Sequence, residues 1–196
     1  MKTIGLLRHG ATPYTNRYIG SSEVELSAEG IAQVRRQHGF LAAQGYDTIF
    51  CSPMKRCVQT YSLLRFPQEC IVDERLREID FGAWEGRSFE EIARLSPNLV
   101  EQWSRNSDDF GFPGGEKLGD FRGRVHSFCE LLRKLADQKI LIIAHGGIIR
   151  YMICCLLGLP IHNYLYFKVD TARLCTLRLY SEGAVLTGLN RGKEDG

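Results

Sequence analysis

Residues 3–10 have the sequence Thr3-Ile4-Gly5-Leu6-Leu7-Arg8-His9-Gly10, an apolar run that stops abruptly at a cation, an imidazole and a glycine. A short apolar run of this kind predicts a buried β-strand, here over 3–8. Open α/β sheets bind ligands in the crevice at the carboxyl ends of their strands. We therefore expect this strand to deliver Arg8 and His9 into such a crevice.

The same pattern returns near the other end of the chain, where Ile140-Leu141-Ile142-Ile143-Ala144 stops at His145-Gly146-Gly147. Two strands that each end in His-Gly would bring two imidazoles to one edge of a sheet. One histidine can then attack a substrate while the second, with Arg8, neutralises an anion. The pair indicates phosphoryl transfer through a phosphohistidine.

Strand-like and helix-like patterns alternate along the rest of the chain. We expect strands over 3–8, 47–51, 71–72, 140–144, 164–169, 174–180 and 184–189. We expect helices over 28–44 after an N-cap at Ser27, over 52–64, 88–95 and 97–103, along 121–135, and along 148–157. This alternation predicts the α/β class, as a three-layer sandwich with a mainly parallel central sheet and helices on both faces. One domain would cover 1–196, with a helical and loop insertion at about 80–119 as a cap.

Bulk properties exclude several kinds of partner. The 196 residues are 44% hydrophobic and 24% charged, with a net charge of +2. This charge is too small to indicate a nucleic-acid or anionic membrane partner, and no apolar segment reaches the roughly 18–20 residues that span a bilayer. We expect a small-molecule phosphomonoester as the partner, with a homodimer as the default oligomer.

The chain contains seven cysteines, an odd number, and none of them forms a Cys-x-x-Cys pair. They are Cys51, Cys57, Cys70, Cys129, Cys154, Cys155 and Cys175. Most lie in apolar surroundings, which is typical of reduced, buried thiols. Because the amino terminus enters a strand without a signal-peptide pattern, we expect a cytoplasmic protein.

Further polar groups are expected at the same edge of the sheet. Arg56 follows the strand 47–51 and lies one turn into the next helix, from which it can point back toward the crevice. Free N–H groups at the helix start near Gly146 favour an anion. Phosphoryl transfer also needs an acid to protonate the leaving oxygen, and Glu78, Asp80 and Glu85 are the candidates.

Together these motifs resemble the histidine phosphatase superfamily, the group that includes cofactor-dependent phosphoglycerate mutases. They occur in the family's order, as 7–12, 52–60, 76–86, 113–116 and 144–147. The resemblance implies that His9 is the nucleophile and Glu78 the proton donor. It implies that Arg8, Arg56 and His145 complete a phosphate pocket, and that neither a metal nor a cofactor is needed.

Two comparisons within the family favour hydrolysis. Mutases have Glu-Arg-His-Tyr-Gly where this chain has Glu78-Ile79-Asp80-Phe81-Gly82, and they are longer. The short first loop and the segments 76–82, 112–116 and 167–170 are similar to those of alpha-ribazole phosphatases. This implies removal of the 5'-phosphate from alpha-ribazole 5'-phosphate in cobalamin biosynthesis.

Four residues are expected to contact the substrate in addition. The family often has a phosphate-binding Asn six residues after the nucleophile, a position occupied here by Thr15, with Asn16 beside it. Gly20 lies in the same loop, and Gly146 begins the helix after the second histidine. Glu116 follows two glycines that let the backbone approach a ligand closely.

Other functions stay open at this stage. The alternatives within the family are a broad-specificity or fructose 2,6-bisphosphatase-like enzyme, a phosphoglycerate mutase, and an inactive module that only binds phosphorylated ligands. A cysteine phosphatase is disfavoured because Cys51-x4-Arg56 is one residue short of the Cys-x5-Arg loop and Pro53 offers no N–H. A metal hydrolase built on His9 and His145 lacks the usual ligand spacing.

Overall fold

The computed structural model describes residues 1–105 and 107–193. Its six-stranded sheet has the order β3-β2-β4-β1-β5-β6. The strands are β1 (Lys2–Arg8), β2 (Thr48–Cys51), β3 (Cys70–Val72), β4 (Lys139–Ala144), β5 (Leu174–Leu179) and β6 (Ala184–Arg191). The first four in this order pair in parallel, and β5 and β6 add antiparallel pairs at one side. The expected α/β class with a mainly parallel sheet is confirmed.

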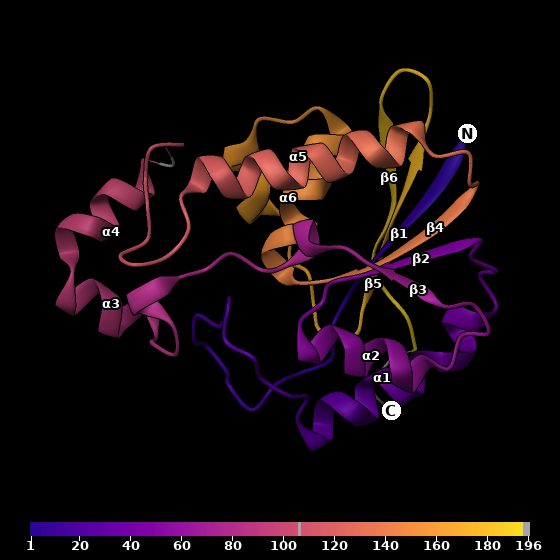
Figure 1. The fold of residues 1–196 in the computed structure, drawn as a ribbon, viewed down its shortest axis with the longest axis horizontal. Coiled ribbons are helices and arrows are strands. Elements are labelled where there is room, and N and C mark those ends of the chain that lie inside the picture. Colours follow the sequence, from indigo (N-terminus) through magenta and orange to yellow (C-terminus); the bar gives the residue numbers. More distant parts are fainter. Residues whose placement is uncertain (106, 194–196) are drawn as a thin grey trace.

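Helices cover both faces of this sheet (Figure 1), with α1 and α2 on one side and α5 and α6 on the other. Their bounds are α1 (Ala28–Ala42), α2 (Lys55–Leu64), α3 (Phe89–Leu95), α4 (Pro97–Ser104), α5 (Leu118–Lys134) and α6 (Gly146–Leu157). The expected N-cap at Ser27 is confirmed, because its side chain accepts from the Gly30 amide at 3.0 Å. No helix in the described ranges is long and apolar enough to cross a membrane.

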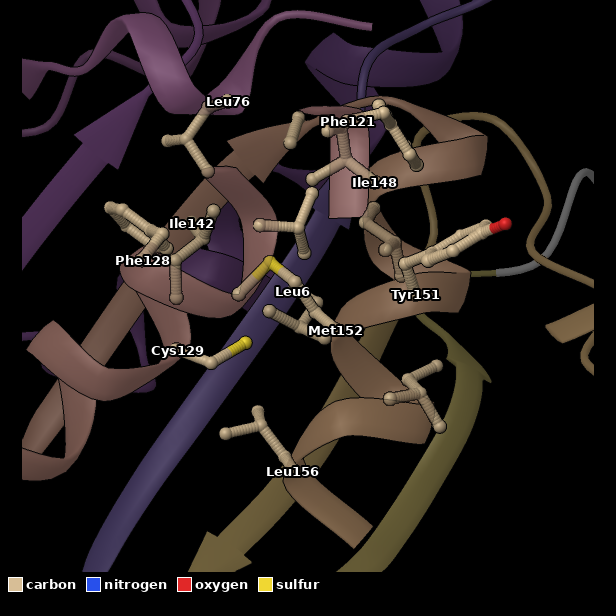
Figure 2. Packing of buried hydrophobic residues seen from close by; sticks show 14 of the residues in the cluster. Leu6, Leu76, Phe121, Phe128, Cys129, Ile142, Ile148, Tyr151, Met152 and Leu156 are labelled. Carbon is tan, nitrogen blue, oxygen red and sulfur yellow. The ribbon is translucent and has the colours of Figure 1, made fainter. Parts of the chain in front are cut away.

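The alternation of side chains along the central strands builds two cores. Ile140 and Ile142 point to the α5–α6 side, where they join one apolar cluster. Leu141 and Ile143 point to the α1–α2 side and join the other. Successive residues of a strand face opposite sides of the sheet, so a strand that is apolar throughout is buried by both layers. Figure 2 shows the first core, with Ile142 among side chains of α5 and α6.

The register of β1 against β4 sets the position of the two His-Gly motifs. Arg8 pairs with Ala144, the last residue of β4. The ladder continues one step further, since the His9 amide donates to the Ala144 carbonyl at 3.0 Å. Both histidines therefore leave the sheet at the same edge, as the sequence predicts.

Two predicted elements are wrong. The helix expected from Ser52 begins at Lys55, because the Ser52 amide still donates to the β4 carbonyl of Ile143 and Met54 keeps an extended backbone. The strand expected over 164–169 is absent from the described sheet, and 3-10 helix η3 (Ile161–Tyr166) occupies the first half of that stretch. There Tyr164 packs on Tyr151 of α6, with ring centroids 4.9 Å apart.

Candidate active site

His9 and His145 lie side by side at the carboxyl ends of β1 and β4. Their ring centroids are 5.2 Å apart at an interplanar angle of 62°. His9 is only 7% exposed and His145 is fully buried. The structure thus brings together the two imidazoles that the sequence places at one sheet edge.

The hydrogen bond of His9 fixes its tautomer. Its Nδ1 lies 2.8 Å from the carbonyl oxygen of Gly10. A carbonyl oxygen only accepts, so Nδ1 carries the proton and Nε2 keeps a free lone pair. Burial, aided by the charges of Arg8 and Arg56, holds the pKa of His9 well below its usual value. His9 is therefore a neutral imidazole at pH 7, the form that can act as a nucleophile.

His145 is held in the opposite tautomer. Nε of Arg56 donates to its Nδ1 at 3.1 Å, so the proton lies on Nε2, which donates to Oγ of Ser52 at 2.8 Å. Burial, then the nearby Arg56 charge, lowers the pKa of His145 well below its usual value. The sequence analysis expects His145 to help neutralise an anion. In this structure the positive charge at that position belongs to Arg56.

Arg56 links the histidine pair to the first loop. It is 1% exposed, and its two terminal nitrogens donate to the carbonyls of Ser22 at 2.9 Å and Gly20 at 2.8 Å. A Cβ at position 20 would overlap the carbonyl oxygen of Ile79. Gly20, expected as a substrate contact, is buried here by packing, and its carbonyl supports Arg56.

Arg8 presents an unused donor at the site. Its Nη1 donates to the Val169 carbonyl at 2.7 Å, whereas its buried Nε has no hydrogen-bond partner within the described ranges. A Cβ added to Gly146 would lie 3.4 Å from the Arg8 guanidinium carbon, so this group lies against the first turn of α6. A buried cationic donor beside a helix amino terminus is suited to bind an anion.

Glu78 is the carboxylate at this helix start. Its Oε2 accepts from the Gly147 amide at 2.9 Å and its Oε1 from the Ile79 amide at 3.2 Å. The other two candidate acids lie elsewhere in the loop network. Asp80 accepts from Ser21 and Gly82, and Glu85 from the backbone of 20–22. Of the three, the geometry favours Glu78 as the acid.

The Glu116 carboxylate is paired with an arginine. Its two carboxylate oxygens accept from Arg124 at 2.7 and 2.9 Å. Arg124 in turn donates to the backbone carbonyls of Arg75, Arg77 and Glu78. Glu116, expected as a substrate contact, thus anchors the segment that carries Glu78. Arg124 is not among the residues that the sequence predicts for the site, and its signal is a cation between Phe121 and Val125 on a buried helix face.

A polar cavity of about 560 Å³ opens beside Arg8. Its lining residues are Arg8, Tyr14, Asn16, Arg17, Tyr18, Phe89 and Glu90. Asn16 lies in this lining with a left-handed backbone, φ 55°, which Asn tolerates better than most residues. Thr15, the expected contact, is exposed and outside the lining. The structure therefore places Asn16 and not Thr15 beside the arginine.

Two apolar cavities share lining residues with this polar one. A cavity of about 170 Å³ shares Tyr18 with it and is lined further by Phe81, Trp103 and Tyr164, among others. A second, of about 270 Å³, shares Phe89 with it and Trp103 and Tyr164 with the first. Tyr18 and Phe89 thus each line both the charged cavity beside Arg8 and an aromatic one.

No group of three or more His, Cys, Asp or Glu side chains in residues 1–105 and 107–193 is arranged to hold a metal ion. His9 instead uses Nδ1 on a carbonyl, and His145 uses its two ring nitrogens on an arginine and a hydroxyl. These contacts suit a site for an anion.

Comparison with known proteins agrees with this geometry. The family model of the histidine phosphatase superfamily, branch 1, matches residues 4–192. Phosphoserine phosphatase 1 of Hydrogenobacter thermophilus is 30% identical over 190 residues, which cover 94% of this chain and 90% of the relative. Adenosylcobalamin/alpha-ribazole phosphatase of Escherichia coli is 27% identical over 190 residues, 94% of each chain. The solved alpha-ribazole phosphatase of Shigella flexneri superposes with a TM-score of 0.86 at 27% identity, over 98% of this chain and 100% of that one.

Proposed function

Because the chain belongs to the histidine phosphatase superfamily, we propose that it hydrolyses phosphate monoesters through a phosphohistidine on Nε2 of His9. The observation that carries this proposal is the bond from His9 Nδ1 to the Gly10 carbonyl. It leaves a neutral nitrogen free to attack, with the cations of Arg8 and Arg56 close enough to lower the pKa of the ring.

In the first step the phosphoryl dianion lies between these cations and the first turn of α6. Nε2 of His9 attacks phosphorus in line with the leaving oxygen. The unpaired Nε of Arg8 donates to an equatorial oxygen, where charge is stabilised in a loose transition state. His145 stays neutral because its Nδ1 accepts from Nε of Arg56, so it orients that cation at the phosphoryl group.

Glu78 serves as the acid and then as the base. It donates a proton to the departing alcohol oxygen, and afterwards takes one from the water that hydrolyses the phosphohistidine. Its position next to Gly147 puts it at the helix start that receives the phosphoryl group. Arg124 and Glu116 act as positioning residues, because they hold the backbone that carries Glu78.

We propose alpha-ribazole 5'-phosphate as the substrate. Two kinds of support exist, namely the similarity to the Escherichia coli and Shigella flexneri enzymes and the two aromatic cavities lined by Trp103 and Tyr164. A flat apolar leaving group fits side chains such as Trp103 and Tyr164. Residues 80–119, which contain α3 and α4, would then cap the site and select the leaving group.

Phosphoserine is the second candidate. Arg17 and Glu90 both line the polar cavity beside Arg8. Charges of opposite sign suit the carboxylate and ammonium of an amino acid ester. The similarity to the Hydrogenobacter thermophilus enzyme supports the same candidate.

Phosphate release across a substrate panel, with a chelator present, tests both the chemistry and the choice of ester. The panel contains alpha-ribazole 5'-phosphate, phosphoserine, fructose 2,6-bisphosphate, 3-phosphoglycerate and p-nitrophenyl phosphate, each with wild type and His9→Ala. We expect release that requires His9 and is fastest for the ribazole ester. Fastest release from phosphoserine would overturn that substrate, and release that survives His9→Ala would overturn the mechanism.

A further inference from the structure

Helices α5 and α6 pack against each other on the sheet face remote from α1 and α2 (Figure 1). On α5, His126, Cys129 and Arg133 are spaced three and four residues apart, so they share one helix face. Cys155 of α6 faces them. Its Sγ lies 3.5 Å from Nδ1 of His126, which brings together a thiol and an imidazole that are not part of the active-site histidine pair.

A second thiol completes this arrangement. Cys129 is fully buried and is the neighbour that does most to lower the pKa of Cys155. Figure 2 shows the Cys129 sulfur directed toward α6. Arg133 crosses to the same helix and donates to the Leu156 carbonyl at 3.3 Å. A thiol donor, an imidazole and a cation thus gather around one sulfur atom.

These neighbours favour the thiolate form of Cys155. Cys129 contributes most, and His126 and Arg133 add to its effect against the opposing effect of burial, so that the pKa of Cys155 falls to about 6. Glu130 lies 3.6 Å from Arg133 and partly offsets its charge. The carboxyl end of α6, at Leu157, disfavours an anion.

The thiol is also open to small molecules. A cavity of about 570 Å³ lies beside it, lined by His126, Tyr151, Cys154, Cys155 and Leu159 among others. Cys155 is partly exposed and His126 is exposed. By contrast, burial raises the pKa of Cys57 to about 12 and also raises that of Cys51. Of these three thiols, Cys155 alone combines access with activation.

We propose that Cys155 is a nucleophilic modification site for hydroperoxides, with Cys129 as its resolving thiol. The Cys155 thiolate attacks the terminal oxygen of the hydroperoxide, breaking the O–O bond. Sulfur is oxidised to a sulfenic acid, the peroxide is reduced, and the departing alkoxide takes a proton from water. The Cys129 thiol then attacks that sulfur, a disulfide forms between α5 and α6, and the hydroxyl leaves with the Cys129 proton as water.

Alkylation of the wild-type protein by iodoacetamide, followed by peptide mass spectrometry, tests the nucleophile. At pH 6 a thiol of pKa about 6 is half ionised, whereas an ordinary thiol is about 0.3% ionised. A thiolate of lower pKa is also a weaker nucleophile, which reduces the rate advantage from the higher thiolate fraction by about tenfold. We expect Cys155 to react at least about tenfold faster than Cys70, a partly buried thiol whose pKa burial raises. Equal rates at pH 6, or a Cys155 midpoint above pH 8, would overturn the proposal.

Treatment with hydrogen peroxide tests the resolving step. Wild type should lose two hydrogen masses and give a Cys129–Cys155 linked peptide. Cys129→Ser should instead give a dimedone adduct on Cys155, Cys155→Ser should give neither, and Cys70→Ser should behave as wild type. A disulfide elsewhere, or no oxidation at Cys155, would contradict the proposal. If Cys129→Ser does not fold because it places a hydroxyl at a buried position, the alkylation rates of the wild-type protein still test whether Cys155 is the nucleophile.

Discussion

Gly147→Ala should separate acid catalysis from the rest of the proposed mechanism. A Cβ at this position would lie 3.1 Å from the carboxyl carbon of Glu78 and would overlap its Oε1. The overlap falls on the far end of a flexible side chain, so we expect the carboxylate to move by about 1 Å while the fold stays intact. A displacement of about 1 Å costs catalysis roughly 100-fold.

The leaving group gives this prediction its sharpest assay. An alkyl phosphate needs a proton on its departing oxygen, whereas p-nitrophenolate leaves without one. We therefore expect kcat/KM to fall about 100-fold for the alkyl ester and only a few-fold for p-nitrophenyl phosphate, since kcat/KM reports the steps up to transfer to His9. Gly39→Ala is the matched control, because a Cβ there meets nothing within 4 Å.

Thermal melting completes the test. Alanine in a helix is more stable than glycine by about 1 kcal/mol, so neither variant should melt earlier than wild type. Equal losses of kcat/KM for the two esters, or no loss for either, would refute the assignment of Glu78 as the acid.

Three other predictions concern pH, packing and positioning. Burial holds the pKa of His9 and His145 well below 6.5 in the folded protein, so the unfolded chain binds more protons below pH 6.5. Denaturant titrations should therefore show the free energy of unfolding falling there by up to about 1.4 kcal/mol per histidine per pH unit. A constant free energy of unfolding from pH 7 to 5 would contradict this. For the same reason, kcat/KM should fall at acid pH as His9 becomes protonated, with a midpoint below pH 6.5. Gly20→Ala forces a Cβ into a backbone carbonyl, so it should lower the free energy of unfolding by about 1–3 kcal/mol, and a variant as stable as wild type would show that this loop can shift. Glu116→Gln weakens the charge-assisted pair with Arg124, so it should lower kcat more than it changes KM. A rise in KM alone would instead indicate that Glu116 binds substrate.

Much of the fold could be predicted from short-range patterns. The apolar runs ending in His-Gly predict both central strands, because a strand buried on two faces is apolar at every position. A capping residue such as Ser27 is a local signal, and Ser27 caps as expected. The segment 164–169 has a strand-like composition, yet Tyr164 packs on α6, a tertiary contact that local pattern does not contain.

The candidate site shows the same limit. Residue type predicts that His9, Arg8, Arg56 and His145 gather at one edge of the sheet. It does not predict which groups are already paired. Glu116 was expected to reach the substrate, but its carboxylate is paired with Arg124, 8 residues further along the chain. The choice between neighbouring loop residues such as Thr15 and Asn16 depends on a left-handed backbone that the folded loop imposes.

The central claim is that a phosphoryl group forms a bond to His9 during turnover. Rapid mixing with p-nitrophenyl phosphate, an alkaline quench that preserves phosphohistidine, and peptide mass spectrometry test it directly. The account predicts one phosphoryl group on the peptide that contains His9, absent from His9→Ala. Turnover with the phosphoryl group on any other residue, such as Cys51, would contradict it.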